Sequence, residues 1–503
     1  MSRIRIALLY SLLLLGGLAP LHARAETLTV GAYSDFQGFD LARVRAFSPN
    51  NILVATAVLE GLFAYDYDHG NAIVPRLAIN FAEAPDRLSA VVSLRPNVRF
   101  HDGTPFDAEA VVYHFSRLLN SQSGLGLAET ILRPLEKVEA VDNLTVKFVL
   151  KHPWSALQSV LAVDQPLNMI GSPTTLRSDP DSFNRHPIGT GPFVFREWRS
   201  GDRVILERNK EYWDPSLPKL DQVVYRVMPD ENTRFQSLKA GELDVAWVDN
   251  TGQIAEARQL PGLKVWEDRG TGGAIWQINT SRPPFDDIRA RAAVIHAFNE
   301  RAFVDGFFLG SAEVAREFFP NTPWTCPGLK WRTYDPDRSR DLVRQLGGKL
   351  SFSVHAYGTP LGRRMNSILQ QFFGEVGIDA KVEPLEVVQL VRRGLAGDFQ
   401  MTQWRFSDYG SDPDLYFSGN SFAPAKYRNP RVDELIRKGQ EEKTFETRRQ
   451  IYCELSGLLV EEAVMLMPDH TYNFLIAQTH VKDVPRNVGN ILRVRGVRIE
   501  KAK

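Results

Sequence analysis

The sequence has very few cysteines and lacks the common motifs of catalysis and nucleotide binding. Cys326 and Cys453 are its only two cysteines in 503 residues. Without CxxC spacing they make a poor metal cage, and the sequence leaves open whether they form a disulfide. GxSxG, HExxH and GxxxxGK[ST] are all absent. We therefore expect no cofactor, no metal and no enzymatic activity, and binding rather than turnover.

The sequence also lacks an excess of charge of either sign. Sixty basic residues balance 60 acidic ones, so there is no electrostatic case for nucleic acid as a partner. The composition is 43% hydrophobic and 24% charged, which argues against disorder and against a multi-span membrane protein. A chain of 503 residues is too long for one hydrophobic core, so two or more lobes are expected.

The first 25 residues have the pattern of a secretory signal peptide. Arg3 and Arg5 precede an apolar run over residues 6–18, and Ala23-Arg24-Ala25 fits a cleavage site. The alternative is a membrane anchor, but the run is shorter than the roughly 20 residues that spanning requires. We expect cleavage after Ala25 and a location in the periplasm of a Gram-negative bacterium.

The clearest local signals lie in the middle of the chain. Residues 193–198 and 203–208 are rich in β-branched and aromatic residues, and the turn residues 200–202 separate them. This pattern predicts a hairpin. Further on, Asp230 can cap a helix and Gly241 can end it.

Strands and helices alternate along the rest of the chain. Helices are predicted over residues 107–119, with Asp107 as N-cap, and over 152–161. After residue 270, strands at 350–357 and 378–384 flank a long helix at 361–376. This spacing predicts an α/β fold, in which ligands bind between lobes or beside the ends of strands.

Five blocks resemble the peptide-type periplasmic solute-binding proteins of ABC importers, solute-binding protein family 5. Within the second block, Gly189-Thr190-Gly191-Pro192-Phe193, Tyr212-Trp213 and Leu238–Asp244 (LKAGELD) match the usual pattern. The blocks cover residues 94–118, 189–244, 279–310, 334–378 and 404–414. They follow the family order over nearly the whole chain after residue 25.

The resemblance implies the type II fold of periplasmic binding proteins, with two main lobes, a hinge and one inserted lobe. Crossings near Asn279 and Phe474 would act as hinges between the main lobes. The expected division is a signal peptide at 1–25, a central lobe at 26–60, 188–278 and 476–503, an inserted lobe at 61–187, and an opposing ligand-binding lobe at 279–475.

The resemblance also implies where a ligand's α-amino group would bind. Peptide-binding members use an Asp that follows a Trp in the last block, and Asp408 with Tyr409 looks like that position. Asp408 lies five residues before Pro413 rather than four, so Asp412 is a rival. The other interpretation is that Asp408 caps a turn.

A ligand carboxylate would need a cation, ideally a bidentate arginine. Arg363 and Arg364 lie near where short-peptide binders of the family place such an arginine, and Arg405 is a third candidate. Trp404 and Tyr409 could line the pocket. A solvated helix face for the arginines and core packing for the aromatics are the competing interpretations.

The function expected from the resemblance is a periplasmic receptor, a monomer that carries short peptides to an inner-membrane ABC permease. The same role for a nickel chelate, glutathione, an opine or an oligosaccharide stays open. A secreted peptide-processing hydrolase is a more distant alternative, since no set of catalytic residues supports it.

Overall fold

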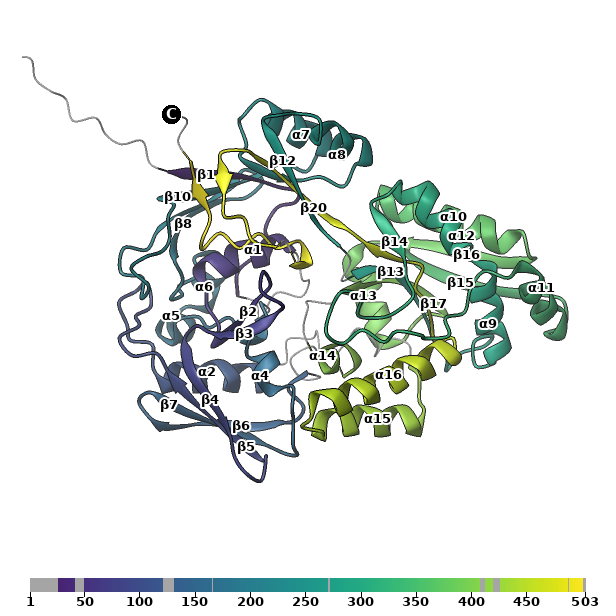
Figure 1. The fold of residues 1–503 in the computed structure, drawn as a ribbon, viewed down its shortest axis with the longest axis horizontal. Helices are drawn as coiled ribbons and strands as arrows, with labels where there is room; N and C mark the ends of the chain where they lie inside the picture. The colour runs from purple at the N-terminus through teal and green to yellow at the C-terminus, as the bar shows by residue number, and fades with distance from the viewer. Residues whose placement is uncertain are drawn as a thin grey trace, which may run out of the picture.

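A seven-stranded sheet gathers strands from both ends of the chain (Figure 1). The computed structural model describes residues 26–40, 49–120, 131–164, 166–269, 272–407, 412–418, 426–486 and 488–500. The strands of this sheet are β1 (Thr27–Ala32), β8 (Phe193–Arg199), β9 (Arg203–Arg208), β10 (Gln222–Val227), β11 (Val245–Trp247), β12 (Leu263–Asp268) and β20 (Asn473–Gln478). Their order is β12-β20-β11-β1-β10-β9-β8, with β1 parallel to both of its neighbours.

Alternating side chains give this sheet two apolar faces. In β11, Val245 and Trp247 pack with α1 (Pro49–Val58) on one face, whereas Ala246 packs with α7 (Glu231–Lys239) and α8 (Thr251–Ala257) on the other. Successive residues of a strand point to opposite faces, so a run of apolar residues is buried on both.

A five-stranded sheet forms the second α/β unit. Its strands are β13 (Gly272–Ile278), β15 (Leu350–Tyr357), β16 (Ile378–Leu385), β17 (Met401–Ser407) and β18 (Met465–Leu466), in the order β16-β15-β17-β13-β18. One face packs with α9 (Ile288–Ala297), α11 (Pro336–Gln345) and α12 (Pro360–Gly374). The other packs with α14 (Pro413–Phe417), α15 (Pro430–Glu441) and α16 (Phe445–Glu461).

A four-stranded antiparallel sheet makes the third unit, between the first and second strands of the seven-stranded sheet in sequence. It comprises β4 (Ala78–Glu83), β5 (Ser89–Leu94), β6 (Leu135–Asp142) and β7 (Thr145–Leu150), and α2 (Ala108–Leu119) and α4 (Leu157–Val160) share its core. Two-stranded sheets pair β2 (Phe63–Asp66) with β3 (Ala72–Pro75), β14 (Ala312–Val314) with β19 (Asp469–Thr471), and β21 (Val481–Lys482) with β22 (Arg498–Ile499).

The remaining elements are short helices. They are α5 (Pro173–Ser178), α6 (Pro180–Arg185), α10 (Glu300–Phe303), α13 (Val387–Ala396), a π-helical turn (Val304–Phe308) and 3₁₀ turns at Pro166–Asn168 and Val488–Asn490. None of the helices in the described ranges combines the length and the apolar character that crossing a membrane requires.

Local sequence signals predicted several elements correctly. β8 and β9 form the expected hairpin. Asp107 accepts a hydrogen bond from Ala110 N and caps α2, and Asp230 accepts one from Thr233 N and caps α7. Each carboxylate satisfies one of the free N–H groups that a helix leaves at its start.

Two predictions about the chain's path are wrong. The boundary expected at residue 278 places β13 with the seven-stranded sheet, but β13 pairs with β17 and β18 in the five-stranded sheet. The helix expected over 152–161 is confined to α4, and the N–H of Ser155 just before it donates to Gln440 O.

A disulfide joins the two cysteines, a question that the sequence left open. Cys326 and Cys453 are 127 residues apart in sequence, and their Cα atoms lie 5.4 Å apart. The bond ties α16 to the segment between β14 and α11.

A buried carboxylate ties the four-stranded unit to the seven-stranded sheet. Glu60 accepts hydrogen bonds from Tyr212 Oη (2.6 Å), Trp213 Nε1 (2.9 Å) and Thr190 Oγ1 (3.0 Å). Arg495 donates in turn to Tyr212 Oη. The Tyr-Trp pair of the second sequence block is therefore part of the scaffold.

Candidate ligand-binding site

Strand ends and chain crossings meet at one edge of the five-stranded sheet, which we call the inter-sheet edge. β15 and β17 are parallel and end there, at Tyr357 and Ser407. The antiparallel β13 begins there, with Gly272 opposite Ser407. The chain enters β13 from β12, and it returns from β19 to β20 at Tyr472. Ligands of α/β proteins bind beside such carboxyl ends of strands.

Arg405 occupies this edge as an exposed cation. It lies on β17 opposite Ala274 of β13. Its side chain makes no hydrogen bond or ion pair with another residue that the structure describes. The Arg405 charge favours ionisation of Tyr357 at the end of β15, although burial raises the pKa of Tyr357 to about 12. A guanidinium in this position can bind a carboxylate.

Asp249 faces Arg405 from the other sheet, in the loop between β11 and α8. Burial and the neighbouring Glu231 charge raise the pKa of its carboxyl, and the Arg405 guanidinium opposes that rise. The residue is nevertheless exposed to solvent. Glu231 holds the loop by accepting from the N–H groups of Asp249 and Asn250.

Asp469 adds a buried carboxyl group near Arg405. It is 0% exposed, and its Oδ2 accepts from Thr471 Oγ1 at 2.7 Å. Its Oδ1 has no hydrogen-bond partner among the described residues. Burial raises the pKa of Asp469 to about 7, against the opposing effects of the Thr471 hydroxyl, the Ala274 backbone N–H and the Arg405 charge. The inter-sheet edge thus holds an exposed cation with no hydrogen-bond or ion-pair partner among the described residues, and a buried carboxyl group whose pKa is raised to about 7.

The other predicted arginines lie at the start of α12. Arg363 and Arg364 are both exposed, and the Arg363 guanidinium donates to Gly358 O. Gly362 brings this helix against the end of β15, because a Cβ at Gly362 would lie 2.8 Å from Tyr357 Cβ. The two arginines therefore lie in the first turn of α12, close to Tyr357. Among the described residues, neither arginine forms a hydrogen bond with Tyr357.

Trp404 points into the protein rather than toward Arg405. Its half-buried ring packs against the core that α14, α15 and α16 cover. A Cβ at Gly394 would lie 2.9 Å from the ring. Core packing was one of the two interpretations of Trp404, and these contacts favour it.

Asp412 is held by the scaffold. Its two carboxylate oxygens pair with Arg448 at 2.6 and 2.7 Å, and it caps α14 through Asp414 N. Both side chains are buried. Asp408 and Tyr409, the rival position for the amino group, lie outside the described residues.

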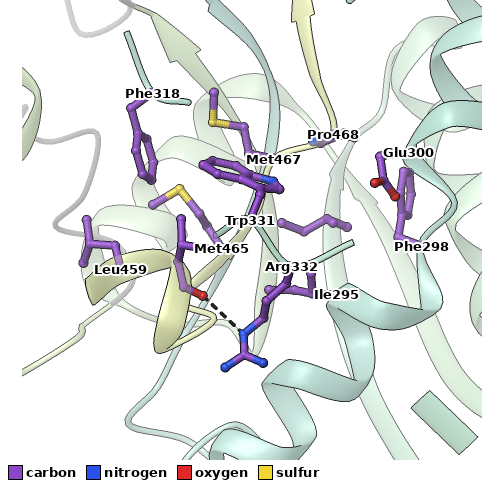
Figure 2. A pocket seen from close by; sticks show the side chains of 12 residues that line it. Ile295, Phe298, Glu300, Phe318, Trp331, Arg332, Leu459, Met465, Met467 and Pro468 are labelled. Carbon is purple, nitrogen blue, oxygen red and sulfur yellow. Dashed lines mark hydrogen bonds between the residues drawn. The ribbon is translucent and has the colours of Figure 1, made fainter. Parts of the chain in front are cut away.

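A small pocket lies elsewhere in the five-stranded unit (Figure 2). Phe318, Trp331 and Met465 give it an apolar lining. Its charged groups are already bonded, since Glu300 pairs with Arg316 and Arg332 donates to Val460 O. Its lining thus offers no free charge for the ends of a zwitterion.

Asp249 and Asp469 were missed from the sequence. Asp249 follows the carboxyl end of β11, and that position could have indicated it. Asp469 has no such signal, because its burial and its unpaired oxygen arise from the packing of β19 beside β13.

A comparison with protein families identifies the family of the chain. Residues 72–427 match the family described as bacterial extracellular solute-binding proteins, family 5 middle. The chain belongs to this family. Family 5 consists of solute-binding proteins.

Alignments with two relatives span most of the chain. The probable di/tripeptide-binding protein 5 of Pseudomonas aeruginosa is 28% identical over 92% of this chain and 93% of its own length. The glutathione-binding protein GsiB of Pectobacterium atrosepticum is 30% identical over 76% of each chain.

Solved structures of family 5 proteins share the fold. The periplasmic binding protein DppA of Helicobacter pylori, in complex with the peptide STSA, superposes with a TM-score of 0.84. It is 22% identical in sequence, and the match covers 94% of this chain and 98% of that one. The expected α/β type II fold of periplasmic binding proteins is therefore confirmed.

Proposed function

We propose that the protein is a periplasmic receptor that binds a short peptide at the inter-sheet edge and delivers it to an inner-membrane ABC permease. The observation that carries this proposal is Arg405, an exposed guanidinium beside strand ends with no described partner. Family membership and the names of its relatives support the peptide class. We further propose that it acts as a monomer and has no catalytic activity.

A zwitterionic peptide suits the charges at this edge. Its carboxylate would pair with Arg405, for which Arg363 and Arg364 are the alternatives. Its ammonium would need a carboxylate, because a closed site strips water from the charge. Asp412 has both oxygens on Arg448, so of the two rivals we retain Asp408.

Three lobes would carry this function. The seven-stranded sheet would form the central lobe, residues 61–187 the inserted lobe, and the five-stranded sheet the third lobe. The boundary expected at residue 278 moves to about 270, because β13 belongs to the five-stranded sheet. The boundary expected at residue 475 moves to about 472, because all of β20 belongs to the seven-stranded sheet. The two crossings would act as hinges for closure around a ligand.

We also propose cleavage after Ala25.

Glutathione is the second candidate ligand. The relative that is 30% identical is a glutathione-binding protein. Glutathione has two carboxylates and one amino group, so it too would engage a free arginine. A nickel chelate, an opine or an oligosaccharide would bind at the same edge with fewer charged contacts.

The test is to identify the ligand and to look for turnover. Mass spectrometry of small molecules released from the purified protein would name a retained ligand. Calorimetric titration with trialanine, the tetrapeptide Ser-Thr-Ser-Ala and glutathione should give saturable binding of at least one, with no product after prolonged incubation. Hydrolysis of a bound peptide would overturn the receptor proposal.

A further inference from the structure

The inserted lobe touches the third lobe where α4 lies beside α14 and α15 (Figure 1). On the inserted side, the contacting residues are Arg87 in the β4–β5 turn and Trp154 and Ser155 just before α4. On the third-lobe side are Asp414 in α14 and the last residues of α15. Leu415 of α14 also packs against the core of the inserted lobe. The contact therefore has apolar and polar parts.

Its buried part is a hydrogen bond between Trp154 and Asp414. Trp154 Nε1 donates to Asp414 Oδ2 at 2.8 Å, and the two residues are 1% and 2% exposed. Ser418 Oγ donates to the other carboxylate oxygen. Removing the indole N–H would leave a buried acceptor unpaired, which costs more than the bond itself contributes.

Its outer part lies at the C-terminal end of α15. Ser155 N donates to Gln440 O at 2.8 Å, and Ser155 Oγ donates to Glu442 O. The Arg87 guanidinium donates to Glu441 O and, at 2.6 Å, to Ser155 Oγ. The last carbonyls of a helix lack partners within it and carry the negative end of its dipole. An arginine from another lobe is well suited to that place.

Arg87 takes part in this contact from an unfavourable backbone conformation. Its φ is +60°, in the left-handed region that favours glycine. The β4–β5 turn would be easier to form with glycine, so the side chain at this position has a use outside the turn. The contact of Arg87 with the end of α15 explains the choice of arginine, because it reaches another lobe.

We infer that Arg87, Trp154 and Ser155 form a closing latch on Asp414 and residues 440–442, and that this latch sets the closed fraction of the ligand-free receptor. The inference rests on the proposed function in one respect: closure of the lobes is what ligand capture requires. The latch contacts residues 412–418 through Asp414. The ion pair of Asp412 with Arg448 holds the same segment to the third lobe.

The consequence is that residues far from the ligand determine affinity. If only the closed form holds ligand tightly, the apparent dissociation constant is the intrinsic one divided by the closed fraction. A variant without the Trp154 or the Arg87 contact should be more open before ligand arrives. Its affinity should then fall by about tenfold, with no change in the groups that touch the ligand.

The experiment measures closure with and without ligand. Nitroxide labels are attached to Val141→Cys in the inserted lobe and Arg437→Cys on α15, both exposed positions. Pulsed electron resonance gives the distance between them in the ligand-free protein. Trp154→Phe and Arg87→Gly should each lengthen that distance, and each should weaken binding of Ser-Thr-Ser-Ala or glutathione about tenfold.

Matched variants separate the latch from local damage. Asn97→Gly changes another residue with positive φ in the same lobe, and Glu83→Gln removes the Arg87–Glu83 ion pair alone. Neither should open the protein. Asp414→Asn keeps an acceptor oxygen for Trp154, and its NH₂ group can donate to Ser418 Oγ in place of the present bond from Ser418. It should therefore behave like the wild type, whereas Asp414→Ala should not. Arg87→Gly suits its backbone, so it tests the latch even if Trp154→Phe folds poorly.

Distances that stay unchanged in Arg87→Gly and Trp154→Phe would overturn the latch, whether or not any probe binds. A longer distance with unchanged affinity would overturn its role in ligand capture. If no probe binds the wild type, the proposed receptor function fails instead, and the ligand-free distances still decide the latch.

Discussion

Arg405 is the charged side chain of the inter-sheet edge whose removal should affect a ligand most directly. Arg405→Gln should weaken binding of a peptide with a free carboxylate by more than tenfold, since a hydrogen bond between charged partners contributes about 2 kcal/mol. Calorimetry on a peptide and on its C-terminal amide provides the measurement. The amide should lose far less affinity than the acid, and equal losses would contradict a carboxylate contact.

Asp408 is the matching prediction for the other end of the ligand, and it rests on the sequence motif. Asp408→Asn should cost at least about 2 kcal/mol of peptide affinity, because it removes the counter-charge of a desolvated ammonium. An N-acetylated peptide serves as the control, since it should bind both forms equally weakly. Unchanged affinity for the free peptide would end this assignment.

Asp469 should make stability depend on pH. Burial raises its pKa to about 7 from an ordinary value of 3.8, so the folded protein keeps a proton that the unfolded chain has released. The free energy of unfolding should therefore fall as the pH rises from about 4 to 7, by on the order of 2–4 kcal/mol.

Denaturant unfolding of the wild type and Asp469→Asn across that pH range measures this contribution. As the pH rises, the free energy of unfolding of the wild type should fall relative to that of Asp469→Asn. A difference that stays constant with pH would show that Asp469 titrates normally.

At the scale of elements, the disulfide constrains the third lobe most. It closes a loop of 127 residues that contains β15, β16, β17 and α11 through α15. Reduction should lower the free energy of unfolding by roughly 3–5 kcal/mol in the chain-entropy account. Scanning calorimetry with and without reductant measures the change, and thiol titration confirms reduction. An unchanged melting temperature in the fully reduced protein would contradict it.

Elements fixed by neighbouring residues could be predicted, whereas pairing between distant ones could not. The β8–β9 hairpin follows from its turn, and α2 and α7 begin at their capping aspartates. The sheet to which β13 belongs depends on β17, more than 120 residues later, and no local pattern encodes that choice. The same holds for the disulfide partner of Cys326.

The site divides in the same way. Family motifs indicated Arg405 and the segment around Asp408, because a short motif carries them. They could not indicate Asp469, whose unpaired oxygen exists only once β19 packs beside β13. Nor could they indicate that Arg448 forms an ion pair with Asp412, since that arginine lies in α16, 36 residues later in the chain.

At the scale of the whole molecule, closure should be visible as a change of size. Small-angle scattering should show a smaller radius of gyration on saturation with a bound peptide, because the proposed closure would rotate the third lobe toward the central one about the two crossings. A non-binding amidated or acetylated peptide is the control. An unchanged radius at saturation would contradict hinge closure.

The seven-stranded sheet has a consequence for the order in which the molecule can be assembled. β20 lies between β11 and β12, although its residues come more than 200 positions later in the chain. The sheet therefore cannot be completed until residue 478 is available, while the five-stranded sheet needs nothing beyond residue 466. A chain that emerges N-terminus first can form its third lobe earlier, and the step that completes its central sheet comes close to the end.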